Sequence, residues 1–481
     1  MTDYPGADFD AAARALLAPD DYENPEPAGR YHLIVIGAGP AGLISAIGAA
    51  GVGARVALIE RGLMGGDCLN VGCVPSKALL EYTARTTAPA FGDAFRWLRE
   101  VRAGIAPHDS VARYNELGAD VFLGEARFVD AHTVAVGDTQ LTGRRIAICV
   151  GARAAVPPIP GLVESSPLTN ETVFDLTEAP DSVAILGAGP IGCELATVFA
   201  RLGVTVHLFE MADRILPLET LAASERLADA LRALGVTLHV GDAVQEVVPG
   251  EPVQVKSAQG IVSVERIVVA LGRSPNTDSL QTENAGVTLD PRGFVVTDAK
   301  LRTSAKHIYA AGDCRGGLQF THHADAQARV VVQNALFAPT ARVDGLVVPH
   351  CTYTHPEIAS VGAREEDLDA ANQPYDVYEV SFDELDRGRA ELDGTGFARV
   401  LTAKGKDKIL GATIVGHDAG EQLAPLCLLM SNGLGLGAAG KALYSYPTRS
   451  EYLKNLANAY TRSRFTPTVA ALFKNWLRLT G

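Results

Sequence analysis

The chain has 481 residues, of which 47% are hydrophobic and 20% charged, and its formal net charge is -14. This composition is typical of a globular protein, and the length exceeds what one hydrophobic core supports, which predicts about three domains. Nucleic acids and anionic membrane surfaces are bound through basic patches, so the acidic balance argues against both as partners.

The N-terminal segment and the cysteines indicate a cytoplasmic location. Residues 1–30 lack the basic region and apolar run of a signal peptide, and no stretch of the chain approaches the length of a membrane span. We expect these residues to form a peripheral extension with at most a short helix over 9–17. Among seven cysteines only Cys68 and Cys73 lie close together, a pattern typical of a reducing compartment.

A dinucleotide-binding fingerprint follows this extension. The apolar run 32–36 predicts a buried parallel strand, which leads into a glycine-rich turn and an alanine-rich helix. The glycines of the turn are Gly37, Gly39 and Gly42. They allow a tight turn, a close approach of the backbone to a pyrophosphate and close packing of helix on strand. The next predicted strand, 55–59, ends in Glu60, which is placed to accept a hydrogen bond from a ribose hydroxyl.

The same unit recurs 150 residues later (187 − 37). A predicted strand over 182–186 leads into a second set of glycines, which are Gly187, Gly189 and Gly192. The following strand, 204–209, ends in Glu210, and the first glycine and the acid are 23 positions apart in both copies (60 − 37 and 210 − 187). Two dinucleotide sites are therefore predicted.

Between the two copies, residues 65–77 read Gly-Gly-Asp-Cys-Leu-Asn-Val-Gly-Cys-Val-Pro-Ser-Lys. Four residues separate Cys68 from Cys73, a spacing that we expect to place both thiols on one helical face. The pair can then close into a disulfide across a single turn. In the reduced state, a helix N-terminus and a nearby positive charge would lower the pKa of either thiol.

This motif resembles that of the flavoprotein disulfide reductases, the family of glutathione reductase, lipoamide dehydrogenase and mercuric reductase. The resemblance implies FAD at the first fingerprint, a nicotinamide dinucleotide at the second, and passage of electrons from NADH through FAD to a Cys68–Cys73 disulfide. Cys68 is then the thiol that meets the substrate, and Cys73 lies against the flavin. The implied fold is α/β, with two Rossmann-like domains followed by an α+β dimerisation domain, in a homodimer whose subunits share the active site.

The resemblance also divides the chain into domains. The implied order is an extension (1–30), a discontinuous FAD-binding domain (31–170 and 297–345) interrupted by an NAD(P)-binding domain (171–296), a dimerisation domain (346–460) and a helical extension (461–481). We expect this last helix to pack onto the dimer. Lys77 is implied to pair with Glu194 near the flavin. The further residues implied to bind cofactors are Ala126, Gly151, Asp313 and Gly272.

The identity of the nicotinamide cofactor depends on the second fingerprint. Glu210 favours NAD over NADP, because a carboxylate at this position would repel the 2′-phosphate of NADP. No arginine pair follows Glu210, although Arg214 lies close to it in the sequence.

The C-terminal motif departs from that of the disulfide-reducing members of the family. They carry His-Pro-Thr-x-x-Glu, whereas this chain carries Tyr446 in place of the histidine and keeps Glu451. Protonation of a leaving thiolate suits a group of pKa near 7, while a free phenol has a pKa of about 10. Tyr446 resembles the tyrosine of mercuric reductase, and Tyr114 matches the second active-site tyrosine of that enzyme. Glu451 either assists Tyr446 or closes a helix capping box with Thr448.

We therefore expect an NAD(P)H-dependent flavoprotein oxidoreductase nearest to mercuric reductase, with a small molecule or metal ion of unknown identity as acceptor. The chain ends without the cysteine pair that delivers the metal in mercuric reductase. Two alternatives stay open: a dihydrolipoamide dehydrogenase or low-molecular-weight disulfide reductase, and a redox-sensing flavoprotein that docks a partner. The cluster at 350–355 is not expected to bind a resident metal.

Overall fold

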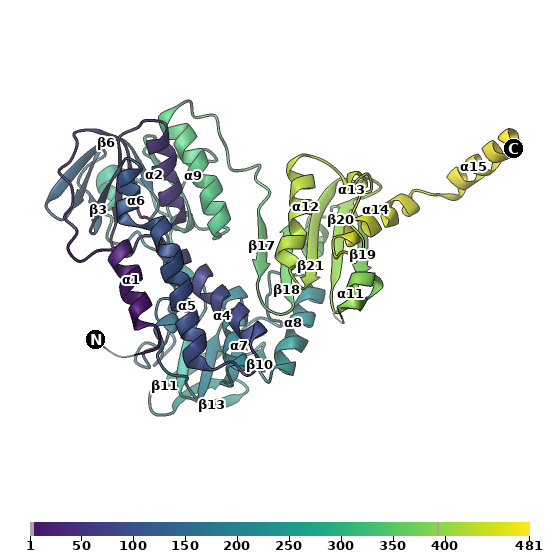
Figure 1. The fold of residues 1–481 in the computed structure, drawn as a ribbon, viewed down its shortest axis with the longest axis horizontal. Helices are drawn as coiled ribbons and strands as arrows, with labels where there is room; N and C mark the ends of the chain where they lie inside the picture. The colour runs from purple at the N-terminus through teal and green to yellow at the C-terminus, as the bar shows by residue number, and fades with distance from the viewer. Residues whose placement is uncertain (1–3, 392–393) are drawn as a thin grey trace. The chain divides into compact units, whose positions relative to one another are not determined.

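The computed structural model describes residues 4–391 and 394–481, which divide into two compact units. Unit 1 runs to Met211 and resumes over Asp242–Gly345; unit 2 consists of Ala212–Gly241 and Leu346–Gly481 (Figure 1). The mixed α/β composition confirms the predicted fold class.

Unit 1 contains most of the helices and parallel strands. Its helices are α1 (Ala7–Leu17), α2 (Pro40–Gly51), α3 (Gly66–Asn70), α4 (Cys73–Arg85), α5 (Phe91–Ile105), α6 (Val111–Glu116), α7 (Pro190–Arg201) and α9 (Thr321–Leu336). Its strands are β1 (Tyr31–Ile36), β2 (Val56–Glu60), β3 (Ala119–Leu123), β4 (Ala126–Phe128), β5 (Thr133–Val136), β6 (Thr139–Ile148), β7 (Ala152–Ala154), β8 (Ser182–Leu186), β9 (Thr205–Glu210), β11 (Val244–Val248), β12 (Val253–Ser257), β13 (Gly260–Val264), β14 (Arg266–Val269), β15 (Arg273–Pro275) and β16 (Ile308–Ala310).

The first fingerprint lies on a sheet of order β3-β2-β1-β6-β5-β4, in which β16 also pairs with β6. Strands β1, β2, β3, β6 and β16 pair in parallel, and β4 and β5 in antiparallel fashion. Strand β1 alternates between two cores: Leu33 and Val35 join the cluster that includes α2 and α9, while Ile34 and Ile36 join the cluster on the other face. Helices α2 and α9 pack side by side (Figure 1). This burial on both faces explains the uninterrupted apolar run.

The second fingerprint lies on a smaller parallel arrangement of β9, β8 and β14, against which α7 packs. Strands β11, β12 and β13 form a separate antiparallel sheet. Each fingerprint therefore sits where a buried parallel strand turns into a helix, as the sequence predicted.

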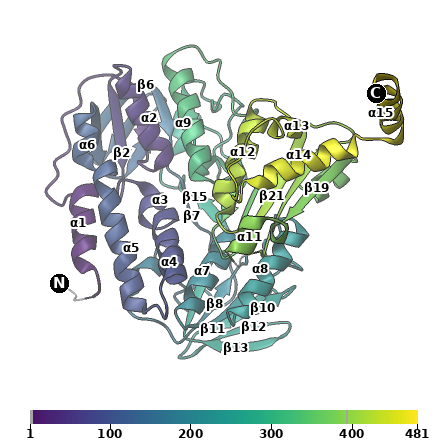
Figure 2. The ribbon, with the colours of Figure 1, turned by 45° about the vertical axis from the view of Figure 1, so that its right-hand side comes forward.

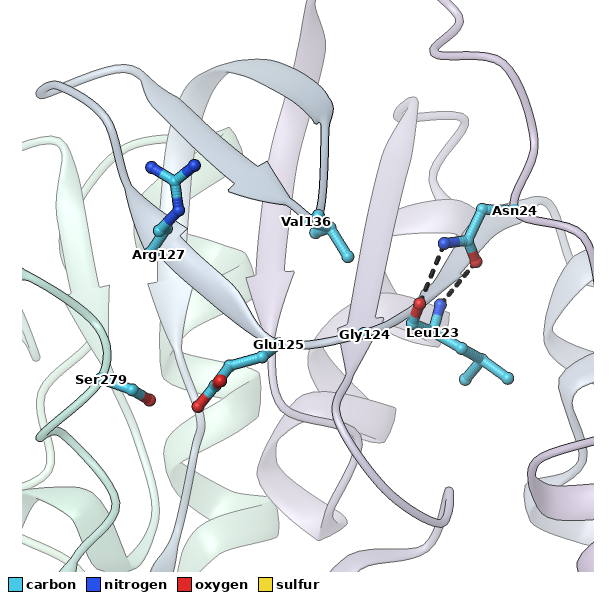
Figure 3. Close-up of a pocket in the computed structure, with 8 residues that line it drawn as sticks. Asn24, Leu123, Gly124, Glu125, Arg127, Val136 and Ser279 are labelled. Atoms are coloured by element: carbon cyan, nitrogen blue, oxygen red, sulfur yellow. Dashed lines mark hydrogen bonds between the residues drawn. The ribbon is translucent and has the colours of Figure 1, made fainter.

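The N-terminal segment is part of the core of unit 1, so the expectation of a peripheral extension was wrong. Helix α1 carries Ala13 and Leu17 four positions apart, and both are buried in the same cluster as β1 and α2. The carbonyl of Leu17 accepts a hydrogen bond from the amide of Met64 at 3.2 Å. Further along, Asn24 exchanges two hydrogen bonds with the backbone of Leu123, at 2.7 and 2.9 Å (Figure 3).

Unit 2 is built on an antiparallel sheet of order β17-β18-β21-β20-β19. These strands are β17 (Pro349–Thr352), β18 (Glu357–Gly362), β19 (Tyr375–Ser381), β20 (Phe397–Ala403) and β21 (Ile409–Gly416), and the unit also contains β10 (Thr237–Val240). Its helices are α8 (Leu221–Ala233), α10 (Glu365–Ala370), α11 (Asp386–Ala390), α12 (Ala419–Ser431), α13 (Leu436–Ala439), α14 (Glu451–Ser463) and α15 (Pro467–Thr480). Helix α12 packs on β18 and β21, and α14 packs on β19 (Figure 2).

The predicted C-terminal helix forms as α15 and contains no buried residue. Thr466 caps the N-terminus of the helix: its hydroxyl accepts a hydrogen bond from the amide of Val469 at 3.4 Å. Leu472, Phe473, Trp476 and Leu477 are all more than half exposed. Its packing onto the dimer stays a prediction.

Candidate active site

The two cysteines of the motif lie on different helices. Cys68 is in α3, and Cys73 is the first residue of α4. The expectation of a single helical face was therefore wrong. A Cβ atom on Gly72 would come within 2.8 Å of the carbonyl oxygen of Asp67, so the chain between the helices turns back tightly on α3. This break places Cys73 at a helix N-terminus, where the backbone dipoles favour a thiolate.

The two thiols have opposite electrostatic preferences. A hydrogen bond from Cys68 is the largest cause that lowers the pKa of Cys73, and Thr321 and Lys77 lower it further. The pKa of Cys68 is raised by the same hydrogen bond and by burial. The hydroxyl of Thr321, the first residue of α9, lies 3.5 Å from the sulfur of Cys73. The reduced pair is therefore poised as a Cys73 thiolate beside a protonated Cys68.

Lys77 and Glu194 come together although 117 positions separate them. The lysine lies on α4, one turn beyond Cys73, and its Nζ atom is 2.8 and 3.0 Å from the carboxylate oxygens of Glu194 on α7. The Glu194 side chain is 5% exposed, so it is a buried carboxylate with a paired cation.

The sequence did not predict a second charged cluster, which joins Arg273 to Asp67 of the cysteine motif. The guanidinium of Arg273 lies 2.5 Å from the carboxylate of Asp67 and 4.0 Å from that of Asp313. Burial raises the pKa of Asp313 to about 6, and Arg273 opposes this rise. These residues come from three separate stretches, and their sequence carries no signal of the pairing. Asp313 itself follows β16, as the resemblance implied.

The first fingerprint fits a bound dinucleotide such as FAD. A Cβ atom on Gly42 would lie 1.7 Å from the carbonyl oxygen of Gly37, so this turn accepts glycine only. Gly39, the N-cap residue of α2, has no side chain to cap the helix, which leaves its first amides for a pyrophosphate. Glu60 accepts hydrogen bonds from the amides of Ala38 and Gly62, at 2.7 and 2.8 Å. The carboxylate thus sits directly beside the turn.

The second fingerprint repeats this geometry. Glu210 accepts a hydrogen bond from the amide of Ala188 at 3.0 Å, as Glu60 does from Ala38. Gly189, the N-cap residue of α7, has no side chain to cap the helix, and a Cβ atom there would meet no atom within 4 Å. The space beside the helix N-terminus is therefore open to a ligand. Gly187 and Gly192 form the same tight contact as Gly37 and Gly42.

The other cofactor residues implied by the resemblance lie at or next to strand ends of unit 1. Ala126 begins β4 and is buried, Gly151 follows β6, and Gly272 precedes β15. A cavity of about 400 Å³ lies next to Ala126, lined by Gly124, Glu125 and Arg127 among others (Figure 3). Neither cysteine of the motif is among its lining residues.

The two candidate tyrosines differ in unit and in burial. Tyr114 is 3% exposed within the core of unit 1, and burial raises its pKa to about 12. Tyr446 is exposed in unit 2, and its hydroxyl donates to the carboxylate of Asp386 at 2.8 Å, which raises the tyrosine pKa. Tyr446 is therefore a hydrogen-bond donor at neutral pH. The active-site roles of both tyrosines stay predictions.

Glu451 begins α14, and its carboxylate lies 3.6 Å from Nζ of Lys454. Within the described residues, Thr448 and Glu451 do not form a capping box. The N-cap residue of α14 is Ser450, and the Thr448 hydroxyl donates instead to the carbonyl of Ser445. The capping alternative was therefore wrong, and the role of Glu451 beside Tyr446 stays a prediction.

Comparison with known proteins agrees with this geometry. Residues 31–328 match the sequence profile of the pyridine nucleotide-disulphide oxidoreductases, and residues 348–457 match the dimerisation domain of the same family. The chain belongs to this family. It is accordingly a flavoprotein oxidoreductase, since the family is FAD-dependent and uses NAD(P)H. The dimerisation domain supports a homodimer.

The similar proteins within this family are named for different activities. A mercuric reductase from Staphylococcus aureus is 33% identical over 457 residues, covering 90% of this chain and 83% of that protein. A dihydrolipoamide dehydrogenase from Chaetomium thermophilum is 32% identical over 460 residues, covering 89% and 90%. The solved Cu(II) complex of the HOCl-induced flavoprotein disulfide reductase RclA from Escherichia coli has a TM-score of 0.83 at 30% identity, covering 90% of this chain and 99% of that chain.

The described part of the chain, 4–391 and 394–481, contains no helix that is long and apolar enough to cross a membrane.

The close contact between Gly42 and Gly37 in the first fingerprint can be tested through the FAD content of a variant. Gly42→Ala places a methyl group against the Gly37 carbonyl and displaces the turn, so we expect the purified variant to retain less than about a tenth of the wild-type FAD. Gly51→Ala at the end of the same helix is the control, because a Cβ atom there meets nothing within 4 Å. Flavin absorbance per protein measures both, and equal FAD content would refute this reading of the turn.

Thr321 provides a test of the thiolate. Its hydrogen bond helps to hold the pKa of Cys73 low, so the thiolate persists at neutral pH and is lost as the pH falls. Thr321→Val should raise the pKa by about one unit or less, which moves this loss to higher pH. The pH dependence of Cys73 alkylation in the reduced protein, followed by mass spectrometry, measures the shift. Thr83→Val, a buried threonine on α4 that hydrogen-bonds only backbone carbonyls, should leave the profile unchanged.

Proposed function

We propose that the protein is a homodimeric NADH oxidoreductase that delivers electrons through the Cys68/Cys73 pair to a soft metal cation or a chemically similar thiophilic acceptor. The observation that carries this proposal is the position of Cys73 at the start of α4, with the hydroxyl of Thr321 3.5 Å from its sulfur and Lys77 one turn further along the helix. Bound FAD would supply the two-electron carrier between the nicotinamide and the cysteines. We further propose that the domain boundaries follow those implied by the family.

The roles that we propose for the charged residues and the two cysteines follow from their contacts. Lys77 keeps a positive charge near Cys73 and favours its thiolate, while Glu194 fixes that lysine. Cys68 is the more weakly acidic thiol and would meet the acceptor. Thiolates are the preferred ligands of soft cations, so Cys68 would release its proton to water when it binds the cation. The two thiolates can then give two electrons, to one Hg(II) or to two Cu(II) ions, and re-form the disulfide, so that no leaving thiolate needs a proton.

The tyrosine at position 446 favours a cation over a disulfide acceptor. Cleavage of a disulfide substrate needs a proton for the leaving sulfur, and the raised pKa of Tyr446 makes it a poorer acid than a histidine. Two relatives fit this choice: the one from Staphylococcus aureus is named a mercuric reductase, and the RclA structure is a Cu(II) complex. A shared active site would require Tyr446 and Glu451 to be supplied by the second subunit.

NADH is the proposed electron donor. Glu210 is held at the end of β9 by the amide of Ala188, where it would meet the ribose of the nicotinamide cofactor. Arg214 could have offset its charge. In unit 2, however, the Arg214 guanidinium hydrogen-bonds the carbonyls of Pro217 and Glu219 and the carboxylate of Glu366. The cytoplasm remains the proposed location, on the cysteine pattern of the sequence.

Dihydrolipoamide dehydrogenase is the alternative that a specific observation favours, since a relative with that name is 32% identical. In this case Tyr446 would act as an unusual acid. Turnover of oxidised lipoamide that exceeds turnover of Hg(II) or Cu(II) would support this alternative.

Steady-state NADH oxidation distinguishes these functions. We expect Hg(II) or Cu(II) to support turnover, oxidised lipoamide and glutathione to support little, and NADPH to replace NADH poorly. Cys68→Ser should reduce metal-dependent turnover roughly 100-fold or more, because the acceptor loses its thiol. Cys427→Ser, in α12 of unit 2, is the control for general loss of a cysteine. Full metal-dependent turnover in Cys68→Ser would contradict the proposal.

A further inference from the structure

A buried ionic cluster joins the N-terminal helix to helix α5. The carboxylate of Asp10, on α1, binds the guanidinium groups of both Arg99 and Arg102 on α5. The arginine side chains are 1% and 9% exposed. Tyr4 completes the cluster through a hydrogen bond from its hydroxyl to Asp10 at 2.9 Å. Two cations so deeply buried need a counter-ion, and α1 supplies it.

One of these arginines reaches the redox motif. The Nη1 atom of Arg102 donates to the carbonyl of Asn70 at 3.1 Å, at a fully buried contact. Asn70 is the last residue of α3, the short helix that carries Cys68, and its carbonyl belongs to the set that no intrahelical amide can satisfy. The next carbonyl, of Val71, accepts from the Asn170 side chain at 3.2 Å. Arg102 and Asn170, which lie outside the motif, thus bind the backbone carbonyls between α3 and α4.

We propose that Asp10 and Arg102 are positioning residues for the Cys68/Cys73 pair, with helix α1 supplying the charge that keeps Arg102 on the Asn70 carbonyl. This inference rests on the proposed redox function of the pair. Both family profiles exclude α1, because the first begins at residue 31. Asp10 thus lies outside the residues that the profiles match, whereas Arg99 and Arg102 lie within them.

Asp10 is the only carboxylate among the described residues that forms an ion pair with Arg102. Asp175 lies close enough for Arg102 to lower its pKa, but burial outweighs this effect and raises the pKa overall. Loss of Asp10 would leave the Arg102 cation without its ion-pair partner. The guanidinium would then move toward water and release the Asn70 carbonyl.

Arg99 serves as a matched control within the same cluster. It lies one turn before Arg102 on α5, is more deeply buried than Arg102, and binds the same carboxylate at 3.1 Å. Its other hydrogen bonds go to the carbonyls of Pro5 and Leu176, at 2.8 and 3.0 Å, neither of which belongs to the redox motif. Loss of Arg99 therefore weakens the anchor of α1 without releasing the cysteine segment directly.

The experiment compares the stability of the Cys68–Cys73 disulfide in the full-length, FAD-containing protein. Wild type, Asp10→Asn, Arg102→Gln and Arg99→Gln are equilibrated in oxidised and reduced dithiothreitol, and the thiols are then alkylated and quantified by mass spectrometry. Release of the segment lowers the effective concentration of one thiol around the other. We therefore expect Arg102→Gln and Asp10→Asn to make the disulfide about tenfold easier to reduce, and Arg99→Gln to change it by less than about twofold.

Thermal unfolding is measured in parallel, because all three substitutions are expected to destabilise unit 1. Equal disulfide equilibria in Arg99→Gln and Arg102→Gln, with similar losses of melting temperature, would overturn the proposal and reduce the cluster to a structural anchor. If Arg102→Gln does not fold, Arg102→Lys replaces it. Lysine keeps the charge but lacks the planar guanidinium that binds the Asp10 carboxylate and the Asn70 carbonyl together. This variant should show the same shift.

The measurement separates this inference from the proposed function. The equilibrium involves only the protein's own thiols and needs neither NADH nor an acceptor. A disulfide that forms and responds to Arg102→Gln but is not reduced by NADH would contradict the proposed electron path and leave the positioning of the cysteines established.

Discussion

The break in the chain between α3 and α4, which separates Cys68 from Cys73, is the constraint on which the site depends. The break makes Cys73 the first residue of a 13-residue helix, where backbone dipoles, Thr321 and Lys77 all favour the thiolate. Continuous helix through this segment would have placed Cys73 in mid-helix, away from that positive end. The electrostatics of the pair therefore follow from a backbone feature.

The same segment is tied to the first fingerprint. A Cβ atom on Gly66 would lie 2.5 Å from the Cα atom of Gly39, so the motif packs directly against the turn that would bind FAD. Glu60 braces that turn from the other side through the amide of Ala38. The cysteine motif and the first fingerprint are thus in direct contact within unit 1, as a short path between a bound flavin and the cysteines would require.

Much of this arrangement could be predicted because it depends on local pattern. The apolar run of β1, the glycine turns and the acids at the ends of β2 and β9 each reflect contacts within a few tens of residues. The Lys77–Glu194 pair joins helices from different parts of the chain, and only the family resemblance indicated it. The break at Gly72 was missed because residue spacing alone cannot distinguish one helix from two. The contacts of Asp10, Arg102 and Arg273 were missed because they join distant segments, and their charged residue types usually lie on surfaces.

The most direct test of the account is an anaerobic titration of the purified protein with NADH, followed by flavin absorbance, in wild type and in Cys73→Ser. The account predicts that a long-wavelength charge-transfer band between the Cys73 thiolate and the flavin develops in wild type and is absent in the variant. Identical bleaching of the flavin in both proteins, without such a band, would contradict it and place the cysteines outside the electron path.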